Sequence, residues 1–443
     1  MTKKVLLKLL EEKKFQSIHE VLSKYNPVDL AGLLSELDDE NMVLVFRMIE
    51  KEKAAEVFSY MDNDLRQVLV KTFSNQEIKY LFDSMFADDA ADFIGDMPAN
   101  VVAQLLENVD GETRVHINHL LQYPDDSVGS IMTVEYIELN PNMTVSQALD
   151  KIREVGNNSE TVYTCYVVEK HKLLGIVSAK NLMISSRDTL IRDLMIDNYI
   201  SVKTNDDKEK AANLFRKYGL IAIPVIDSEG CIVGIVTFDD AIDVLTEEAT
   251  EDIHKMAAIT ASDEPYLKTS VLKHAKNRIP WLLVLMLSAT ITGSIISKYE
   301  QAFAVIPLLV SFIPMLMDTG GNCGSQSSTL IIRGLAVDEL HFSDIPKIFW
   351  KEFRVSLLVS FALALANGIR ITLVYGDVQL AFVVSISLIG TIVIAKLVGC
   401  LLPVLAKKCR LDPAIMAAPL ITTIVDAFSI IIYFRIATLV FKL

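Results

Sequence analysis

Several residue patterns that accompany catalysis are missing from this chain of 443 residues. No GxxxxGK[ST] or HExxH motif occurs, and the seven histidines are scattered along the chain. These absences argue against a P-loop nucleotide hydrolase and against a zinc hydrolase. The five cysteines form no CxxC pair, so we expect reduced thiols and no zinc site. The sequence therefore favours a protein that is not an enzyme.

The start of the chain has no signal for secretion. Its first residues, MTKKVLLKLLEEKKF, lack the uninterrupted apolar core of a cleavable signal peptide. We therefore expect the part that follows to stay in the cytoplasm.

Acidic residues are scarce in the last 173 residues, which hold 9 of the 56 Asp and Glu and 15 of the 42 Lys and Arg. The first 270 residues hold the other 47 acids and 27 bases, so the two net charges of −20 and +6 sum to the −14 of the whole chain. An acidic, polar part followed by an apolar, slightly basic part indicates one region in water and one in a membrane. The strong acidity argues against nucleic acid as a partner, because a polyanion would be repelled.

Residues 1–123 consist of short amphipathic blocks, such as DLAGLLSELD and NMVLVFRMIE, that return about every 11–13 residues. Apolar residues recur within each block at three- and four-residue spacing, which is typical of helices. A stack of short helices predicts an α-solenoid with an interaction or regulatory role. A generic helical bundle is the alternative.

Residues 124–245 contain a tandem repeat, because GIVSAKN at 175–181 returns as GIVTFDD at 234–240, 59 residues later. Each copy follows a helix-like segment and a buried apolar strand. The pattern resembles a pair of CBS domains, an α+β fold that often binds adenine nucleotides. The resemblance implies a nucleotide site at Ser178 with Asn181 and at Thr237 with Asp240. Asn181 departs from the acid that the family prefers, and such pairs also serve as dimerisation scaffolds.

The segment 239–280 is acidic in its first half and free of Gly and Pro before Pro265, and it predicts one connecting helix between the cytoplasmic part and the membrane. Its core is the segment 246–278. Five apolar stretches follow within 279–443, at about 280–297, 302–332, 347–375, 379–406 and 412–440. Each is near the roughly 20 residues that cross a bilayer as a helix. We therefore predict an all-α transmembrane domain of five helices.

Basic residues predict how these helices are oriented. Lys and Arg cluster before the first stretch, between the second and third, and between the fourth and fifth. The positive-inside rule then places the N-terminus in the cytoplasm and the C-terminus outside, in a multi-pass protein of the cell (inner) membrane.

Polar residues interrupt two of the five stretches. The second contains Asp318 and Asn322 among glycines, and the fifth contains Asp426, 14 residues beyond Asp412 and so about 21 Å along a helix. An isolated carboxylate at this depth is costly unless it meets a cation or a partner. Together with the hydroxyls of Thr422 and Thr423, Asp426 supplies the hard oxygen ligands that suit Mg²⁺, Ca²⁺ or Mn²⁺.

Two alternatives to a cation site follow from the same residues. Asp426 could pair with a buried base, for which Lys396 and Arg435 are the candidates. Asp318 could cap a break in its helix, because it lies beside Thr and Gly.

The order of segments resembles the MgtE family of magnesium channels, as do the strings EEATEDIHKMAA, MDTGGNCGSQSSTL and DPAIMAAPLITTIVDAFSIIIYF. The resemblance covers essentially the whole chain and implies Mg²⁺ as the transported ion, a homodimer with its pore on the twofold axis, and Asp426 as the pore acid. It also implies carboxylates that sense intracellular Mg²⁺ and close the pore. These are Asp88, Asp92, Glu209, Asp240, Asp243, Glu248, Glu251 and Asp252.

One departure concerns Gly219, which stands where the family often has an acid. The open alternatives are a transporter of Mn²⁺ or Co²⁺, a cation exporter with a CBS regulatory module, and a membrane sensor without a pore. A chloride channel is disfavoured, because an anion path would not hold an unpaired acid at its centre.

Overall fold

The computed structural model describes residues 3–95, 97–262, 266–267, 269–299, 305–416 and 418–442. The chain divides into two compact units, Met1–Leu245 and Thr246–Leu443. The first unit holds the short helices and the strands, and the second holds the long apolar helices.

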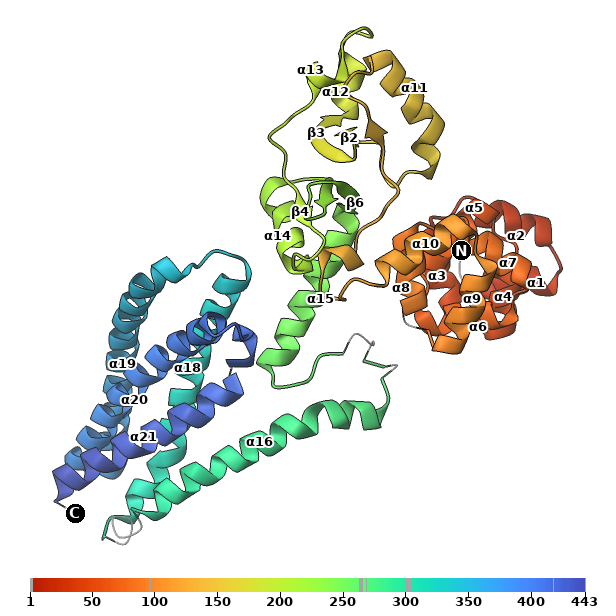
Figure 1. Ribbon diagram of the computed structural model, residues 1–443. Helices are drawn as coiled ribbons and strands as arrows, with labels where there is room; N and C mark the ends of the chain where they lie inside the picture. Colours follow the sequence, from red (N-terminus) through yellow and green to blue (C-terminus); the bar gives the residue numbers. More distant parts are fainter. Residues whose placement is uncertain are drawn as a thin grey trace. The chain divides into compact units, whose positions relative to one another are not determined.

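Ten short helices open the first unit (Figure 1). Asn26, Asp38 and Ser74 cap three of them with side-chain oxygens, and the frequent caps and turns explain why no helix here exceeds ten residues. The apolar blocks of the sequence face a common core, where Phe58 lies 5.1 Å from Phe93, ring centre to ring centre. The helices are α1 (Lys3–Glu11), α2 (Phe15–Leu22), α3 (Pro27–Ser35), α4 (Asp39–Phe46), α5 (Lys51–Ser59), α6 (Asn63–Thr72), α7 (Asn75–Phe82), α8 (Ala87–Gly95), α9 (Ala99–Asn108) and α10 (Gly111–Leu120).

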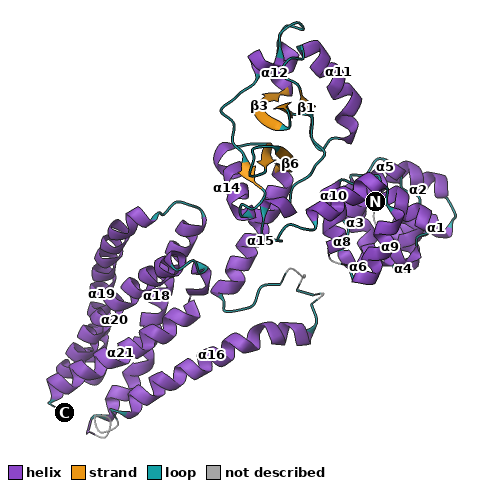
Figure 2. Ribbon diagram, in the orientation of Figure 1, coloured by secondary structure: helices purple, strands orange, loops and turns teal. Residues whose placement is uncertain are grey.

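Two small sheets of identical topology follow (Figure 2). In each, the first strand pairs in parallel with the second, and the second pairs antiparallel with the third. The first repeat comprises β1 (Glu138–Leu139), α11 (Val145–Val155), β2 (Thr164–Glu169), β3 (Lys172–Ser178), α12 (Ala179–Ile184) and α13 (Ile191–Leu194). The second comprises β4 (Val202–Lys203), α14 (Lys208–Tyr218), β5 (Ala222–Ile226) and β6 (Ile232–Thr237).

The repeated glycine has the same structural role in both copies, which is to allow a neighbouring segment to approach the sheet closely. A Cβ atom on Gly175 would lie 2.8 Å from the carbonyl oxygen of Ile196, and one on Gly234 would lie 2.6 Å from that of Thr133. Each glycine therefore lets a neighbouring segment pack directly onto the third strand of its sheet, as the bridges of Ile196 and Thr133 indicate. The tandem α+β repeat predicted from the sequence is confirmed.

The connecting segment is not one helix, and this part of the prediction is wrong. Helix α15 (Phe238–Met256) ends in a turn where Ala258 has a φ of 54°, and α16 (Val271–Ser297) starts afresh at its N-cap Ser270. Ala258 is uncommon in the left-handed region, and no Gly or Pro precedes it to signal a break. The acidic half of the segment and the basic half thus form two helices.

The second unit contains the long helices α16, α18 (Ile313–Ala336), α19 (Ile345–Tyr375), α20 (Val378–Lys408) and α21 (Ala418–Phe441). Four described helices are long and apolar enough to cross a membrane, namely α16, α19, α20 and α21 with their flanking turns. Helix α18 is 24 residues long but more polar. It begins after a 3-10 turn at Pro307–Phe312, and residues 302–304 of the predicted second stretch lie outside the described residues. The all-α membrane domain is confirmed, and the count of five spans stays a prediction.

Candidate functional site

Two acids of the membrane domain lie close together although they come from different helices. Asp318 is exposed on α18 and Asp426 is half-buried on α21, and their carboxylates interact electrostatically. Helix α18 continues this polar face, because Asn322, Gln326 and Thr329 are also exposed and follow at helical spacing. The structure thus brings three of the sequence-predicted residues, Asp318, Asn322 and Asp426, to neighbouring faces of α18 and α21.

Two glycines permit this approach. A Cβ atom on Gly321 would lie 2.9 Å from Cγ2 of Thr422, and one on Gly320 would lie 2.8 Å from Cγ1 of Val425. Real Cβ atoms do not come this close to other atoms, so α18 could not pack against α21 with a side chain at either position. Both glycines lie inside a regular helix, so α18 has no break for Asp318 to cap.

Thr422 and Thr423 lie one turn before Asp426, as predicted. Both hydroxyls donate to the carbonyl oxygen of Pro419, at 2.9 and 3.0 Å, which leaves their oxygen lone pairs as acceptors for a cation or its waters. Pro419 lies in the first turn of α21, where a proline removes no helical hydrogen bond. Pro419 therefore frees no carbonyl group within α21.

Neither predicted base pairs with Asp426 among the described ion pairs. Lys396 is 5% exposed on α20, and its Nζ lies 3.8 Å from Oε2 of Glu352 on α19. Arg435 is exposed on α21. Lys396 therefore lies against the neighbouring helices α18 and α19. Sequence analysis missed Glu352, although its position seven residues inside α19 is a recognisable signal.

A cluster of acids lies where α8 meets the CBS pair. Burial raises the pKa of Asp88 well above its usual value, with Asp240 as the largest contribution from a neighbouring charge. Oδ1 of Asp88 is shielded from solvent and has no hydrogen-bond partner among the described residues. Burial likewise raises the pKa of Glu160 to about 8 and that of Asp240 to about 6, with help from neighbouring carboxylates. The cluster comprises Asp88, Asp89, Glu135, Glu160, Asp239 and Asp240.

The sequence pointed to only two members of this acidic cluster, Asp88 and Asp240. Asp89 and Asp239 are their direct chain neighbours, whereas Glu135 and Glu160 lie far from both in the chain and are revealed only by the folded contacts. Glu135, for instance, accepts a hydrogen bond from the backbone nitrogen of Ala87 at 3.1 Å. Within the described residues, no three His, Cys, Asp or Glu side chains converge tightly enough to coordinate one metal ion directly.

The remaining predicted sensor acids lie on three helices. Asp92 is exposed on α8, and Glu209 is in the first turn of α14. Four lie on α15, namely Asp243, Glu248, Glu251 and Asp252. Gly219 ends α14 with a φ of 63°, a conformation that favours glycine over an acid. Its departure from the family pattern therefore has a local backbone reason.

One acid of α15 is bound to a base within the chain. Nζ of Lys255 lies 2.6 Å from Oε1 of Glu251 and 2.6 Å from Oδ2 of Asp412, just before α21. Burial acts to lower the pKa of Lys255, but the hydrogen bonds to Asp412 and Glu251 outweigh it and hold this pKa above its usual value. Met256 packs beside them against Ile332 of α18. The end of α15 is thus tied to the C-terminal part of α18 and to the residues just before α21, the two helices that carry Asp318 and Asp426.

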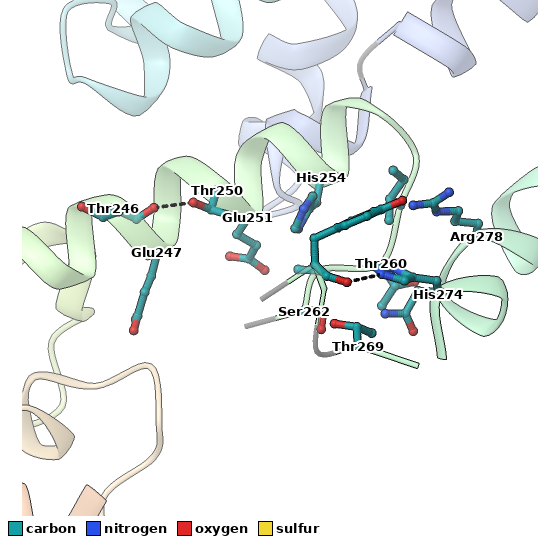
Figure 3. A pocket seen from close by; sticks show the side chains of 14 residues that line it. Thr246, Glu247, Thr250, Glu251, His254, Thr260, Ser262, Thr269, His274 and Arg278 are labelled. Carbon is teal, nitrogen blue, oxygen red and sulfur yellow. Dashed lines mark hydrogen bonds between the residues drawn. The ribbon is translucent and has the colours of Figure 1, made fainter. Parts of the chain in front are cut away.

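The turn between α15 and α16 encloses a pocket of about 440 Å³ (Figure 3). Glu251 and His254 line it from α15, and His274 and Arg278 line it from α16. Nε2 of His274 lies 3.1 Å from the carbonyl oxygen of Tyr266. The pocket follows from the break in the connecting segment and adds no residue to the acidic cluster.

The residues of the predicted nucleotide site are engaged locally. Ser178 caps α12 by accepting a hydrogen bond from the backbone nitrogen of Asn181 at 3.2 Å. The hydroxyl of Thr237 lies 2.5 Å from carboxylate oxygens of both Asp239 and Asp240. Asp240 therefore belongs to the acidic cluster, and a phosphate placed beside it would meet several carboxylates.

Comparisons with known proteins cover nearly all of the chain. The model of a divalent cation transporter family, MgtE, matches residues 313–436, that of the MgtE intracellular N domain matches 25–126, and that of the CBS domain matches 128–187 and 191–247. The magnesium transporter MgtE of Thermus thermophilus is 34% identical over 99% of this chain and 98% of its own length. That of Bacillus subtilis is 31% identical over 97% and 95%.

Two solved structures resemble the first unit. The cytosolic domain of the Mg²⁺ channel MgtE, crystallised with ATP, is 32% identical, has a TM-score of 0.52, and covers 55% of this chain and 99% of its own. The soluble part of a magnesium transporter is 28% identical, with a TM-score of 0.53 and coverage of 56% and 98%. Full-length similarity, the CBS pair and the helical membrane domain agree, and the chain belongs to the MgtE family of magnesium transporters.

Proposed function

We propose that Mg²⁺ crosses the membrane along the polar faces of α18 and α21, and that Asp426 is the acid that attracts it. The observation that supports this path most strongly is the meeting of Asp318 and Asp426 from two helices. Mg²⁺ releases its waters reluctantly and is usually bound through one or two carboxylates. A site with only two carboxylates, those of Asp318 and Asp426, suits such an ion. Loss of uptake on substitution of Asp426 tests the path.

A second copy of the chain completes the path in this proposal. The polar row of Asp318, Asn322, Gln326 and Thr329 is exposed in the single chain. Polar side chains at membrane depth face protein or water rather than lipid. A twofold axis beside α18 would make two such rows line one water-filled path, and the transporter would be a homodimer.

The acidic cluster is the proposed sensor of intracellular Mg²⁺. Burial raises the pKa values of Asp88, Glu160 and Asp240, and repulsion between the like charges gathered at this junction raises them further. The orphaned oxygen of Asp88 and the all-carboxylate donor set suit Mg²⁺, held directly or through its waters. Bound Mg²⁺ would relieve the repulsion and favour the closed arrangement.

This proposal predicts a pH dependence without Mg²⁺. Carboxyls with raised pKa values hold protons in the native protein that they lose on unfolding, so stability falls as pH rises from about 5 to about 8. We expect the unfolding midpoint of the full chain to be about 5 °C lower at pH 8 than at pH 6, and Mg²⁺ to remove most of the difference. Thermal unfolding in detergent measures this.

The matched comparison is Glu160→Gln against Glu154→Gln, since Glu154 is an exposed acid on α11. Glu160→Gln should flatten the pH dependence, and Glu154→Gln should leave it unchanged. Equal pH dependence in all three proteins would contradict the account of the cluster.

The bond between Lys255 and Asp412 gives a further prediction. In this ion pair, the ammonium group of Lys255 on α15 binds the carboxylate of Asp412 just before α21. Loss of the pair should therefore weaken closure of the ion path by Mg²⁺. Lys255→Met should raise the internal Mg²⁺ concentration for half-inhibition by about threefold, while Lys255→Arg should stay near wild type. Uptake measured against internal Mg²⁺ shows this, and an unchanged midpoint in Lys255→Met would exclude a role in closure.

Two further features complete the proposal. ATP would bind at the CBS pair beside Ser178 and Asn181, since the crystallised cytosolic domain of an MgtE relative contains ATP. The N-terminus would lie in the cytoplasm and the C-terminus outside the cell membrane, because the bases cluster at the predicted cytoplasmic ends of the helices.

A further inference from the structure

Three polar side chains from three helices meet inside the membrane domain, away from the proposed ion path. Oγ of Ser327 on α18 donates to Oε2 of Glu352 on α19 at 2.6 Å. Nζ of Lys396 on α20 donates to the same Oγ at 3.2 Å and lies 3.8 Å from Oε2 of Glu352. Ser327 and Lys396 are 0% and 5% exposed. We call these three residues the buried triad.

Stability alone is a poor explanation for the buried triad. The desolvation of two charges offsets most of their attraction, and apolar residues of similar size often stabilise a protein as well or better. Ionisable residues within membrane helices are rare for this reason and commonly serve function. The place of the triad on α18 indicates what that function is.

Ser327 lies on the opposite side of α18 from the polar row. It follows Asp318 by nine residues, which is two and a half helical turns. One turn earlier, the backbone of α18 at Gly324 touches α20 so closely that a Cβ atom on Gly399 would overlap the carbonyl oxygen of Gly324. The contact between Gly324 and Gly399 fixes the distance between α18 and α20. It includes no directional bond that would fix the rotation of α18 about its own axis.

We propose that the buried triad locks the rotation of α18, and thereby sets how Asp318 and Asn322 face the ion path. Glu352, Ser327 and Lys396 are then positioning residues that select the ion without touching it. This inference rests on the proposed ion path. Loss of the triad would let α18 turn, so that the oxygen ligands no longer match hydrated Mg²⁺ and discrimination against Co²⁺ declines.

Cys323 provides a direct measure of rotation. It is 5% exposed and lies on α18 between the polar row and Ser327, whereas Cys400 on α20 is 2% exposed. In full-length protein with Cys231→Ser and Cys409→Ser, we expect Ser327→Ala, which breaks the triad without changing any charge, to speed thiol labelling of Cys323 by about fivefold and to leave Cys400 unchanged. Equal acceleration at both cysteines would mean general loosening and would overturn the proposal.

A second experiment tests the effect on transport, by measuring how strongly Co²⁺ competes with Mg²⁺ for uptake into proteoliposomes. Lys396→Met and Glu352→Gln should each lower the preference for Mg²⁺ about fivefold, and the exchanged pair Lys396→Glu with Glu352→Lys should recover part of it. If both single variants kept the wild-type preference for Mg²⁺ over Co²⁺, the proposed role of the buried triad would be overturned, while the proposed ion path would stand. If Asp426→Asn in the same assay transports normally, the ion path itself fails and the lock fails with it.

Discussion

Replacing Asp426 with Ala or Asn should reduce Mg²⁺ uptake into proteoliposomes to the level of empty liposomes. Asp426 is the ninth residue of α21, and its carboxylate is within electrostatic reach of Asp318 on α18, so in the proposed path it supplies the negative charge that attracts a divalent cation. Loss of the attraction between this charge and the cation should cost well over about 1.4 kcal/mol, and each such increment is a factor of about ten in rate. Asn keeps the shape, so its failure would identify charge as the cause.

The matched control is Glu339→Gln, because Glu339 is an exposed acid outside the described helices. It should transport as wild type does. Asp318→Asn should reduce uptake less than Asp426→Asn, since Asp318 is the more exposed of the pair. Full uptake by both Asp426 variants would remove this residue from the path.

Neutralising five acids of α15 together should leave the transporter active at high internal Mg²⁺. The variant carries Asn or Gln at Asp240, Asp243, Glu248, Glu251 and Asp252. Asp240 belongs to the acidic cluster, and Glu251 helps to tie α15 to Asp412 through Lys255. Without these charges, there is little repulsion between carboxylates for Mg²⁺ to relieve. Inhibition of uptake by internal Mg²⁺ should therefore disappear or need at least about tenfold more Mg²⁺.

Total charge is the main confounding factor, because residues 1–270 carry a net charge of −20. A control with the same change of charge neutralises five exposed acids elsewhere in the first unit, namely Glu36, Asp39, Glu40, Asp150 and Glu154. It should keep wild-type inhibition. An unchanged midpoint in the α15 variant would refute the sensor assignment, and equal loss in both variants would attribute it to bulk charge.

Local patterns in the sequence predicted much of the architecture. The 59-residue repeat identified both CBS sheets, because each copy needs glycine at the same close approach, at Gly175 and Gly234. Hydropathy predicted the four most apolar helices, since length and composition decide whether a helix can span a membrane. It did not predict the break after Met256, because Ala258 reverses the chain without a residue type that signals a turn.

The candidate sites were predictable only in part. Asp426 stood out because a single acid in an apolar stretch is rare, whereas the partner of Lys396 did not, since Glu352 is 44 residues away on another helix. The acidic cluster was underestimated for the same reason: Glu135 and Glu160 reach Asp88 only through the folded contact between α8 and the CBS pair. Long-range pairing is not encoded in spacing, so it becomes visible only in three dimensions.

The most direct test is Mg²⁺ uptake measured against the Mg²⁺ concentration on the side of the membrane that holds the first unit, for wild type, Asp426→Asn and the α15 variant in parallel. We predict wild-type uptake that falls as this concentration rises, no uptake by Asp426→Asn, and uptake by the α15 variant that stays high throughout. Wild-type uptake that does not respond to Mg²⁺ on that side would contradict the account.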